Sequence, residues 1–432
     1  MPRLTIRKNW ILDGFRIGLI IAGLVLLGSR LSTDSADAQA ENNAPNPVEK
    51  YIVLAWNDLG MHCYNRDFKD LAVLPPFNTL WAQVIRVGDP PQVITTGITV
   101  EFFFENNTYS VGKSNFWTYD VELFNDDLPD NVGLTGTGLF GDMTLAGDHF
   151  EAVGIPLTEF NDGDHITPYP YQLATVVVRQ QGTNLELARA KVVAPVSTEM
   201  HCDYCHYDRG PGNEDIATGV IEQNLLTKHD EENSGKYPAG SGLLMNRRPI
   251  LCAECHASNA LSLPGVPGIP NLSHAMHEKH NERVPDTLNG CYSCHPGPQT
   301  KCLRDVMSLS PYNLDCIDCH GTMFTVANKP NPWLNEPRCD NVACHGSGFQ
   351  QDQPLYRMSK QHGGVYCEGC HDSTHAVAAS REPSDWIKFD ALQGSHGTLK
   401  KCTVCHLTWP SQPGPHNLSF QLRSMYLPVV LR

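Results

Sequence analysis

The chain has 432 residues, of which 41% are hydrophobic and 18% charged, so it can bury a sizeable core and is too apolar to be disordered throughout. The net charge is −15, and the body of the chain has no Lys/Arg-rich run. The chain therefore lacks the basic surface by which proteins bind nucleic acid or an anionic membrane. Sixteen Cys and 19 His are unusual in so long a chain, because disulfide frameworks normally serve small domains. We therefore expect cysteine and histidine to carry the function.

Residues 1–40 have the pattern of a secretory signal peptide. Basic residues from Arg3 to Arg16 precede an apolar run of 12 residues at 17–28, and Ala38-Gln39-Ala40 is a cleavage site of the A-x-A type. An uncleaved anchor is the alternative, but 12 apolar residues fall short of the roughly 20 needed to span a bilayer. Cleavage would leave a chain of net charge near −17 without a transmembrane span, located in the periplasm, at the cell surface or outside the cell.

Residues 48–195 predict a β-rich domain. Five or more strands in this segment predict an N-terminal all-β, sandwich-like fold, with aromatic residues of the run 98–104 on an inner face. Asp/Asn-rich loops at 125–131 and 161–164 carry oxygens that suit calcium, but such clusters are more typical of plain turns. The strand-like runs, separated by Gly, Asn, Asp and Pro clusters, are 51–56, 79–87, 98–104, 171–178 and 185–193.

From residue 197 onward a Cys-x-x-Cys-His unit occurs six times, where chance at this Cys and His content predicts roughly 0.03 copies. A seventh unit has four residues between its cysteines, Cys339 and Cys344, and ends in His345. The regular cysteine pairs are Cys202 and Cys205, Cys252 and Cys255, Cys291 and Cys294, Cys316 and Cys319, Cys367 and Cys370, and Cys402 and Cys405. The histidines that follow them are His206, His256, His295, His320, His371 and His406.

This spacing predicts covalent attachment of c-type haem. Two cysteines three residues apart on a helical turn can each add across a haem vinyl group, and the adjacent His can then bind the iron. Zinc is the alternative to haem, since C-x-x-C pairs also bind zinc. A zinc site, however, does not require a His directly after the second Cys of each pair. For the longer seventh unit the alternative is a disulfide or a plain loop.

Through these seven motifs, residues 197–410 resemble the multihaem c-type cytochromes, a family that includes occasional C-x4-C-H sites. The resemblance implies seven haem c groups, attached outside the cytoplasm. A region of residues 196–432 leaves about 34 residues per haem, too few for an ordinary apolar core around each cofactor. We therefore expect a heptahaem domain that is mostly irregular, with short α-helices carrying the motifs and the haems forming the core.

The seven motif histidines would be the proximal iron ligands, and further histidines would supply the distal ones. Enough are present to make every iron six-coordinate, which favours electron transfer over catalysis. His62, in a Met-His-Cys triplet like that at His201, and several methionines are alternative ligands. The distal candidates are His201, His229, His274, His277, His280, His362, His375 and His396, with His416 the weakest.

The expected function is extracytoplasmic electron transfer to redox partner proteins or extracellular acceptors. One alternative is a multihaem reductase or oxidase with an open haem, for which the irregular unit of His345 would be the first place to look. Another is a homo-oligomer or filament of haem-bearing subunits. Cys63 and Cys302 lie outside the motifs, and a disulfide between them would link the two regions.

Overall fold

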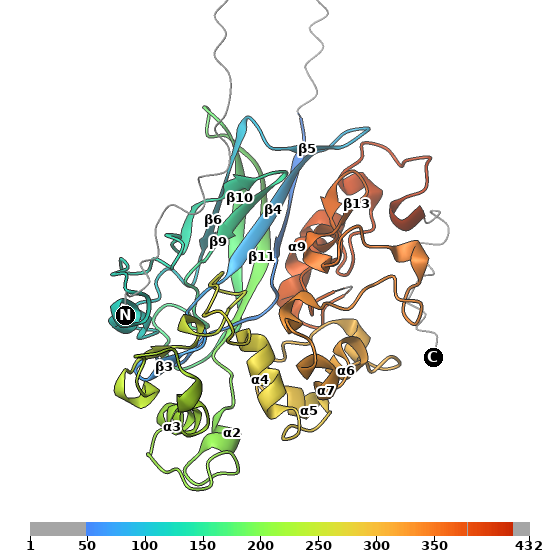
Figure 1. Cartoon of the computed structure of the whole chain (residues 1–432). Helices are drawn as coiled ribbons and strands as arrows, with labels where there is room; N and C mark the ends of the chain where they lie inside the picture. Colours follow the sequence, from blue (N-terminus) through green and yellow to red (C-terminus); the bar gives the residue numbers. More distant parts are fainter. Residues whose placement is uncertain (1–48, 378, 418–432) are drawn as a thin grey trace, which may run out of the picture.

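The computed structural model describes residues 49–377 and 379–417, so the expected signal peptide lies outside the described residues. Strands of two to twelve residues dominate the chain up to Ser197, and short helices with irregular connections follow (Figure 1). The predicted order of a β-rich part followed by a region of short helices is therefore correct at this level. None of the helices in the described ranges is both long and apolar enough to cross a membrane.

Two five-stranded sheets form the β-rich part. The first has the order β1-β4-β9-β8, with β5 also paired to β4, and the second has the order β2-β11-β10-β6-β7. Within the second sheet β2 runs parallel to β11, and the other pairs are antiparallel. The strands are β1 (Tyr51–Asn57), β2 (His62–Cys63), β4 (Thr79–Arg86), β5 (Gln92–Ile94), β6 (Ile98–Phe104), β7 (Phe140–Asp142), β8 (Thr144–Ala146), β9 (His149–Val153), β10 (Tyr171–Gln180) and β11 (Glu186–Ser197).

The burial of β1 and β6 shows how the sheets are covered. On β6 burial alternates, so Phe102 and Phe104 enter the core shared by the two sheets while the residues between them face outward. On β1 six consecutive residues are buried, because Val53 and Ala55 enter that core while Leu54 enters a second core on the opposite face. The first sheet is therefore covered on both faces, as a continuous apolar run requires.

One helix, α1 (Phe116–Phe124), departs from the all-β expectation for residues 48–195. Its buried residues Phe116, Leu123 and Phe124 recur at helical spacing and pack into the core of the two sheets. The left-handed backbone of Asn125 ends the helix, and its N–H donates to the carbonyl of Val121.

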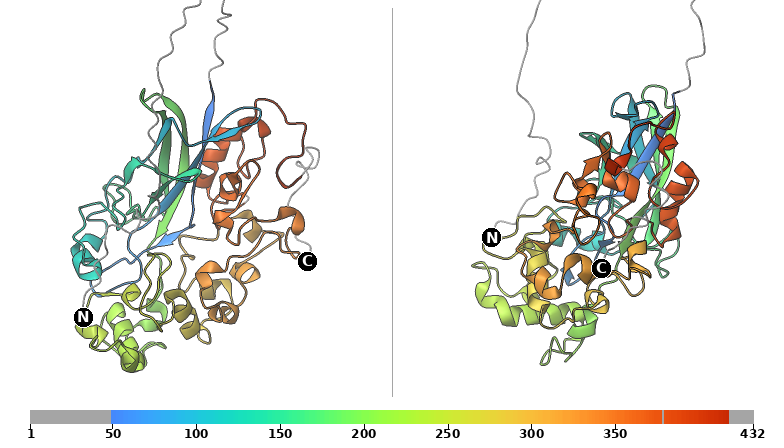
Figure 2. Two further views of the ribbon diagram at one scale, coloured as in Figure 1. Left: turned by 45° about the horizontal axis from the view of Figure 1, so that its top comes forward. Right: turned by 90° about the vertical axis from the view of Figure 1, so that its right-hand side faces the viewer.

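The region after Ser197 lies below the two sheets and along one side of them, as the two views of Figure 2 show. Two short sheets pair β12 (Ile250–Leu251) with β3 (Leu71–Ala72), and β13 (Lys360–Gln361) with β14 (Val365–Tyr366). The α-helices are α2 (Asp203–His206), α3 (Ile221–Asn233), α4 (Leu272–His280), α5 (Leu288–Cys291), α6 (Cys316–His320), α7 (Met323–Ala327), α8 (Cys367–His371) and α9 (Pro383–Gln393). The 3-10 turns are η1 (Ser234–Lys236), η2 (Leu244–Asn246), η3 (Cys252–Glu254), η4 (Val306–Ser308), η5 (Pro332–Leu334), η6 (Ser347–Phe349), η7 (Tyr356–Met358), η8 (Cys402–Val404) and η9 (Pro415–Asn417).

The C-terminal part of this region is fastened to the first sheet. Tyr366 and Val404 join β1 and β4 in the second core, so two of the Cys-x-x-Cys-His units stand directly on the sheet. The amide of Tyr366 donates to the buried Gln83 side chain at 3.0 Å. On α9, buried Lys388 donates to the carbonyl of Ala55 at 3.1 Å and to Asp372 at 2.7 Å. The sheets therefore position the last units of the series.

Candidate haem sites

Each Cys-x-x-Cys-His unit forms a single turn, which lies on an α-helix or a 3-10 turn except in the unit of His295, where it follows the end of α5 at Cys291. In four units the backbone N–H of the motif His donates to the carbonyl of the first Cys, at 2.9 to 3.0 Å. This bond sets the His on the same turn as the cysteines, with the spacing that haem attachment requires. The four units end in His206, His256, His295 and His406.

The seventh unit reaches the same relation by a wider turn. The N–H of His345 donates to the carbonyl of Cys339 at 3.3 Å, although five residues lie between them. The extra residues are held by Asn341, whose carbonyl accepts from the N–H groups of Cys344 and Gly346. The bond between the His and the first Cys that characterises the regular units is therefore kept.

All 16 cysteines lie in the described part of the chain and are free thiols there. Cys63 and Cys302 lie close enough for their charges to interact, and burial raises the pKa of both thiols. The sulfur of Cys302 is also 3.4 Å from Nδ1 of His375. The motif cysteines are thus unpaired, as thioether formation would require.

Six of the seven motif histidines stand opposite a second imidazole. The ring centroids in these six pairs are 6.0 to 6.3 Å apart. An iron bound on both sides at about 2 Å, with each ring centre about 1.1 Å beyond its nitrogen, would place the centroids about 6.2 Å apart. The pairs are His206 with His280, His256 with His229, His295 with His277, His320 with His375, His371 with His416, and His406 with His362.

Hydrogen bonds fix the orientation of these rings. On α4, Nδ1 of His277 donates to the carbonyl of Ser273 at 2.7 Å, and Nδ1 of His280 donates to that of Met276 at 2.6 Å. A metal-binding His normally donates its other ring N–H in this way, which leaves Nε2 for the metal. The same arrangement joins Nδ1 of His256 to the carbonyl of Pro270, of His206 to Asn213 Oδ1, of His229 to the Tyr237 hydroxyl, and of His406 to Asp89 Oδ1.

Burial keeps several paired rings neutral, the form that has a lone pair for a metal. It lowers the pKa of His295 and His371 to about 4 and that of His375 to about 3. In each case a neighbouring paired His lowers the pKa further, since two adjacent imidazoles resist being charged together. At neutral pH these rings are ready to act as ligands.

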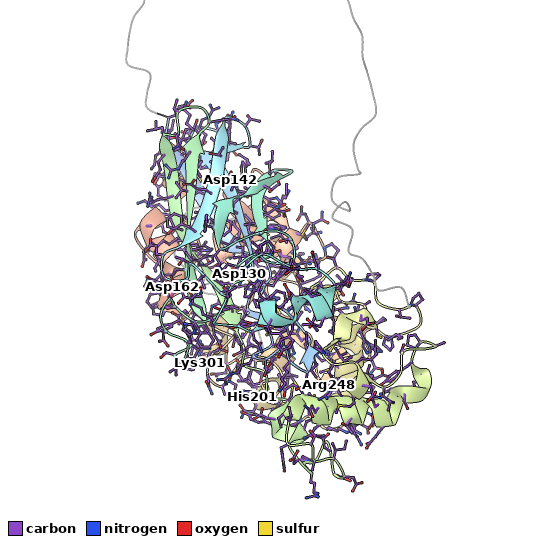
Figure 3. All side chains as sticks on the ribbon, turned by 90° about the vertical axis from the view of Figure 1, so that its left-hand side faces the viewer. Asp130, Asp142, Asp162, His201, Arg248 and Lys301 are labelled. Atoms are coloured by element: carbon purple, nitrogen blue, oxygen red, sulfur yellow. The ribbon has the colours of Figure 1, made fainter. Side chains whose placement is uncertain are left out.

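Three of the distal candidates have other contacts. His201 stacks on Tyr204 at 4.3 Å, with Nε2 3.2 Å from Glu199, and His396 stacks on Trp386 at 4.4 Å. Figure 3 shows His201 below the strands, at the level of Arg248 and Lys301. The third candidate, His274, donates from Nδ1 to the carbonyl of Lys329, and its Nε2 lies 3.5 Å from the Glu278 carboxylate. In the β-rich part, Nε2 of His62 is 3.2 Å from the carbonyl of Pro75, a contact that occupies the nitrogen a distal ligand would use.

Thiols of successive units lie close enough to influence one another's pKa, and this proximity gives the spatial order of the units. Burial raises the pKa of Cys294, and the nearby Cys205 adds to it. Cys291 and Cys316 share a hydrogen bond. The same electrostatic proximity relates Cys319 to Cys344, Cys339 to Cys367, and Cys370 to Cys405.

The remaining unit, that of His256, lies next to the unit of His206, at the opposite end of the series from the unit of His406. Its partner His229 lies on α3, which packs against α2, the helix of His206. The spatial order is therefore not the order along the chain. It runs through the units of His256, His206, His295, His320, His345, His371 and His406.

Comparisons with protein-family models, with curated proteins and with solved structures found no match. Within the described ranges no group of three or more His, Cys, Asp or Glu side chains is arranged to hold a metal ion. A haem iron takes four nitrogens from its own macrocycle, so a facing pair of imidazoles completes its coordination. The residues present therefore suit haem through two protein ligands at a time.

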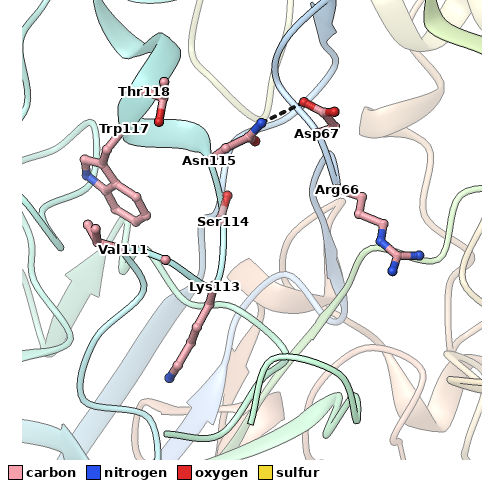
Figure 4. A pocket seen from close by; sticks show the side chains of 9 residues that line it. Arg66, Asp67, Val111, Lys113, Ser114, Asn115, Trp117 and Thr118 are labelled. Atoms are coloured by element: carbon pink, nitrogen blue, oxygen red, sulfur yellow. Dashed lines mark hydrogen bonds between the residues drawn. The ribbon is translucent and has the colours of Figure 1, made fainter. Parts of the chain in front are cut away.

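A pocket of about 660 Å³ in the β-rich part carries no haem-binding residue type (Figure 4). Two of its polar side chains are already paired, since Asn115 donates to Asp67 at 2.7 Å and Lys113 to Asp162 at 2.7 Å. Arg66 and Trp117 also line it. It lies in a different part of the sequence from the seven units.

Several residues that support the imidazole pairs were missed from sequence. Asp89 comes from the β-rich part, 317 residues before His406, and no local pattern indicates their contact. Tyr237 and Asn213 lie near their histidines in sequence, but their spacing is not a motif. His416, the weakest distal candidate on spacing, stands opposite His371 at 6.1 Å.

Proposed function

We propose that the protein is an exported heptahaem c-type cytochrome that conducts electrons along its haems. The observation that carries the proposal is the set of six imidazole pairs at 6.0 to 6.3 Å, each joining a motif His to a His outside the motifs. A random packing of histidines would not join six of the seven motif rings each to one non-motif ring at nearly the same separation. The free cysteine pairs beside these rings supply the attachment points.

In this function haem iron supplies the reversible one-electron chemistry. The motif cysteines would hold each macrocycle, and in six of the units a pair of neutral imidazoles would bind the iron. Tyr237, Asn213 and Asp89, together with backbone carbonyls, keep the rings from turning. Because the ligands are fixed before and after electron transfer, little rearrangement is needed.

The spatial order of the units supports conduction along a continuous row. From the unit of His206 to that of His406, each unit has a thiol near a thiol of the next unit in the spatial order. The unit of His256 extends the row through α3. The two ends of the row, at His256 and His406, are the places where we expect redox partner proteins or extracellular acceptors to exchange electrons. The signal-peptide pattern of residues 1–40 supports a location outside the cytoplasm.

The test is the number and kind of haems in the purified protein. We expect the denatured protein to carry the mass of seven covalent haems, with absorption spectra of low-spin c-type haem. Replacing Cys339 and Cys344 together by Ala should leave six. A protein without covalent haem after co-expression with a haem-attachment system would contradict the proposal, and six haems in the unmutated chain would remove the seventh site alone.

A further inference from the structure

His345 differs from the other six motif histidines in what stands beside it. All 19 histidines lie in the described ranges, and there His345 is the motif histidine for which no second imidazole lies at 6.0 to 6.3 Å. The ring in contact with it is that of Phe349, with centroids 5.2 Å apart. A phenyl ring has no lone pair to donate to a metal.

The irregular ligation coincides with the irregular motif. The unit of His345 has four residues between its cysteines, and two independent observations, one of sequence and one of structure, therefore mark the same site. The three histidines of this region left outside the pairs, His201, His274 and His396, make their described contacts with residues outside the His345 unit. Phe349 also packs on His416 at 4.9 Å, the distal partner of the next unit.

The unit is open to solvent and central in the row. Val342 is 91% exposed and the Cys344 residue is also exposed, so the turn that carries the two cysteines faces solvent. Its cysteines lie near Cys319 on one side and Cys367 on the other. Electrons can therefore arrive from both neighbouring units.

We propose that the iron held by His345, in a haem attached to Cys339 and Cys344, keeps its sixth coordination position for a small exogenous ligand. This inference rests on the proposed function, because it needs a haem at the seventh unit. The ligand class is a diatomic such as carbon monoxide or nitric oxide for ferrous iron, and a small anion such as cyanide for ferric iron. The other six irons are closed by a second imidazole and exclude such ligands.

Carbon monoxide binding to the reduced, full-length holoprotein tests the inference. We expect one carbon monoxide per seven haems, and one high-spin haem per molecule in the ferric state by EPR. Seven haems by mass with no carbon monoxide binding would overturn the inference and leave the proposed function standing. Absence of covalent haem would overturn both, so the two failures are distinguishable.

Variants locate the open site. The double substitution Cys339→Ala with Cys344→Ala should abolish carbon monoxide binding while six haems remain. His416→Ala should raise the stoichiometry from one to two, because it opens the iron of His371. If wild type binds none and His274→Ala binds one, His274 closes the seventh iron and the inference is wrong. Binding that survives the double Cys substitution would place the open site elsewhere and would also overturn it.

Discussion

The hydroxyl of Tyr237 accepts a 2.7 Å hydrogen bond from Nδ1 of His229 and donates one of 2.8 Å to the Asp230 carboxylate. Burial raises the pKa of Tyr237, so the group remains a neutral hydroxyl at physiological pH. Asp230 also accepts from the N–H groups of Leu244 and Met245. A single ring is thus oriented by a chain of partners that makes it a stronger donor to a metal.

Tyr237→Phe removes the acceptor for the N–H of His229. A less basic imidazole stabilises ferric iron less, so the midpoint potential of one haem should rise by on the order of 50 mV. Redox titration followed by EPR measures the shift, and Tyr169→Phe, at an exposed tyrosine, is the matched control. An unchanged set of potentials would show that the hydroxyl does not tune this haem.

The Asp58 carboxyl is buried, and its ion pair with the Arg357 guanidinium is long, at 3.8 Å. Burial raises the pKa of Asp58 to about 7, and Arg357 only partly opposes this. Because the folded carboxyl binds a proton more tightly than the unfolded one, folding takes up a proton between about pH 4 and pH 7. The neutral Asp58 therefore makes its full contribution to the free energy of unfolding below about pH 4, and this contribution is lost as the pH rises towards 7.

Asp58→Asn should remove this pH dependence. At pH 8 the variant should be more stable than the wild type by on the order of 2 kcal/mol, and at pH 4 the two should be alike. Urea unfolding of the holoprotein across this range measures the difference. A variant that is less stable at pH 8 would mean that the ion pair with Arg357 outweighs the burial of the charge.

At the scale of elements, α4 serves two sites at once. His277 and His280 are three residues apart on this nine-residue helix, and they face His295 and His206 respectively. The helix begins at a capped turn, where the Asn271 side chain accepts from the N–H of Ser273. One short helix therefore positions the paired rings of two neighbouring units.

Ala275→Pro should disturb both sites together. Proline removes the N–H that donates to the carbonyl of Asn271, and its ring clashes with that carbonyl, at a cost of about 3 kcal/mol. We expect two additional high-spin haems per molecule by EPR, and Ala275→Ser as a control should add none. A change at one haem alone would show that His277 and His280 are held independently.

At the scale of the whole molecule, the sheets and the motif region share a core. The Tyr366 ring packs between Trp56 and Trp81, at 5.6 and 5.4 Å. It directly precedes the Cys367 unit, and Val404 of the last unit joins the same cluster. The scaffold and the two units at its side should therefore lose their structure together.

Tyr366→Ala should lower the stability of the holoprotein by about 3 kcal/mol, because it leaves a cavity in this shared core. The transition seen in the far-ultraviolet signal of the strands and that seen in haem absorption should shift together. Tyr169→Ala, at an exposed position, is the control and should shift neither. Two separate transitions would show that the sheets and the motif region unfold independently.

The parts that could be predicted from sequence are those set by local patterns. Strands at the runs near Tyr51, Thr79 and Ile98 follow from β-branched and aromatic residues between turn clusters, and they are present. The helix α1 was missed, because its apolar spacing lies within a segment of strand character. The spacing of the haem units is equally local, and the assignment of haem itself stays a prediction.

The partners of the motif histidines could not be assigned in the same way. His362 precedes its partner His406 by 44 residues, whereas His375 follows its partner His320 by 55 residues. The partners therefore have no constant spacing from which the sequence could predict them. The pairing depends on how the helices pack around one another and on the sheets. Supporting residues such as Asp89 lie even farther away along the chain.

The uneven spacing of the imidazole pairs has a consequence for the order in which the protein matures. If the chain leaves the cytoplasm N-terminus first, the partners of His256, His295 and His406 emerge before them, so these haems can complete their coordination at once. The haems of His206, His320 and His371 must instead wait for 74, 55 and 45 further residues. If haem is attached as proposed, irons at these three units would be exposed during that interval to oxidants and small ligands, and the speed of secretion would affect how many molecules mature intact.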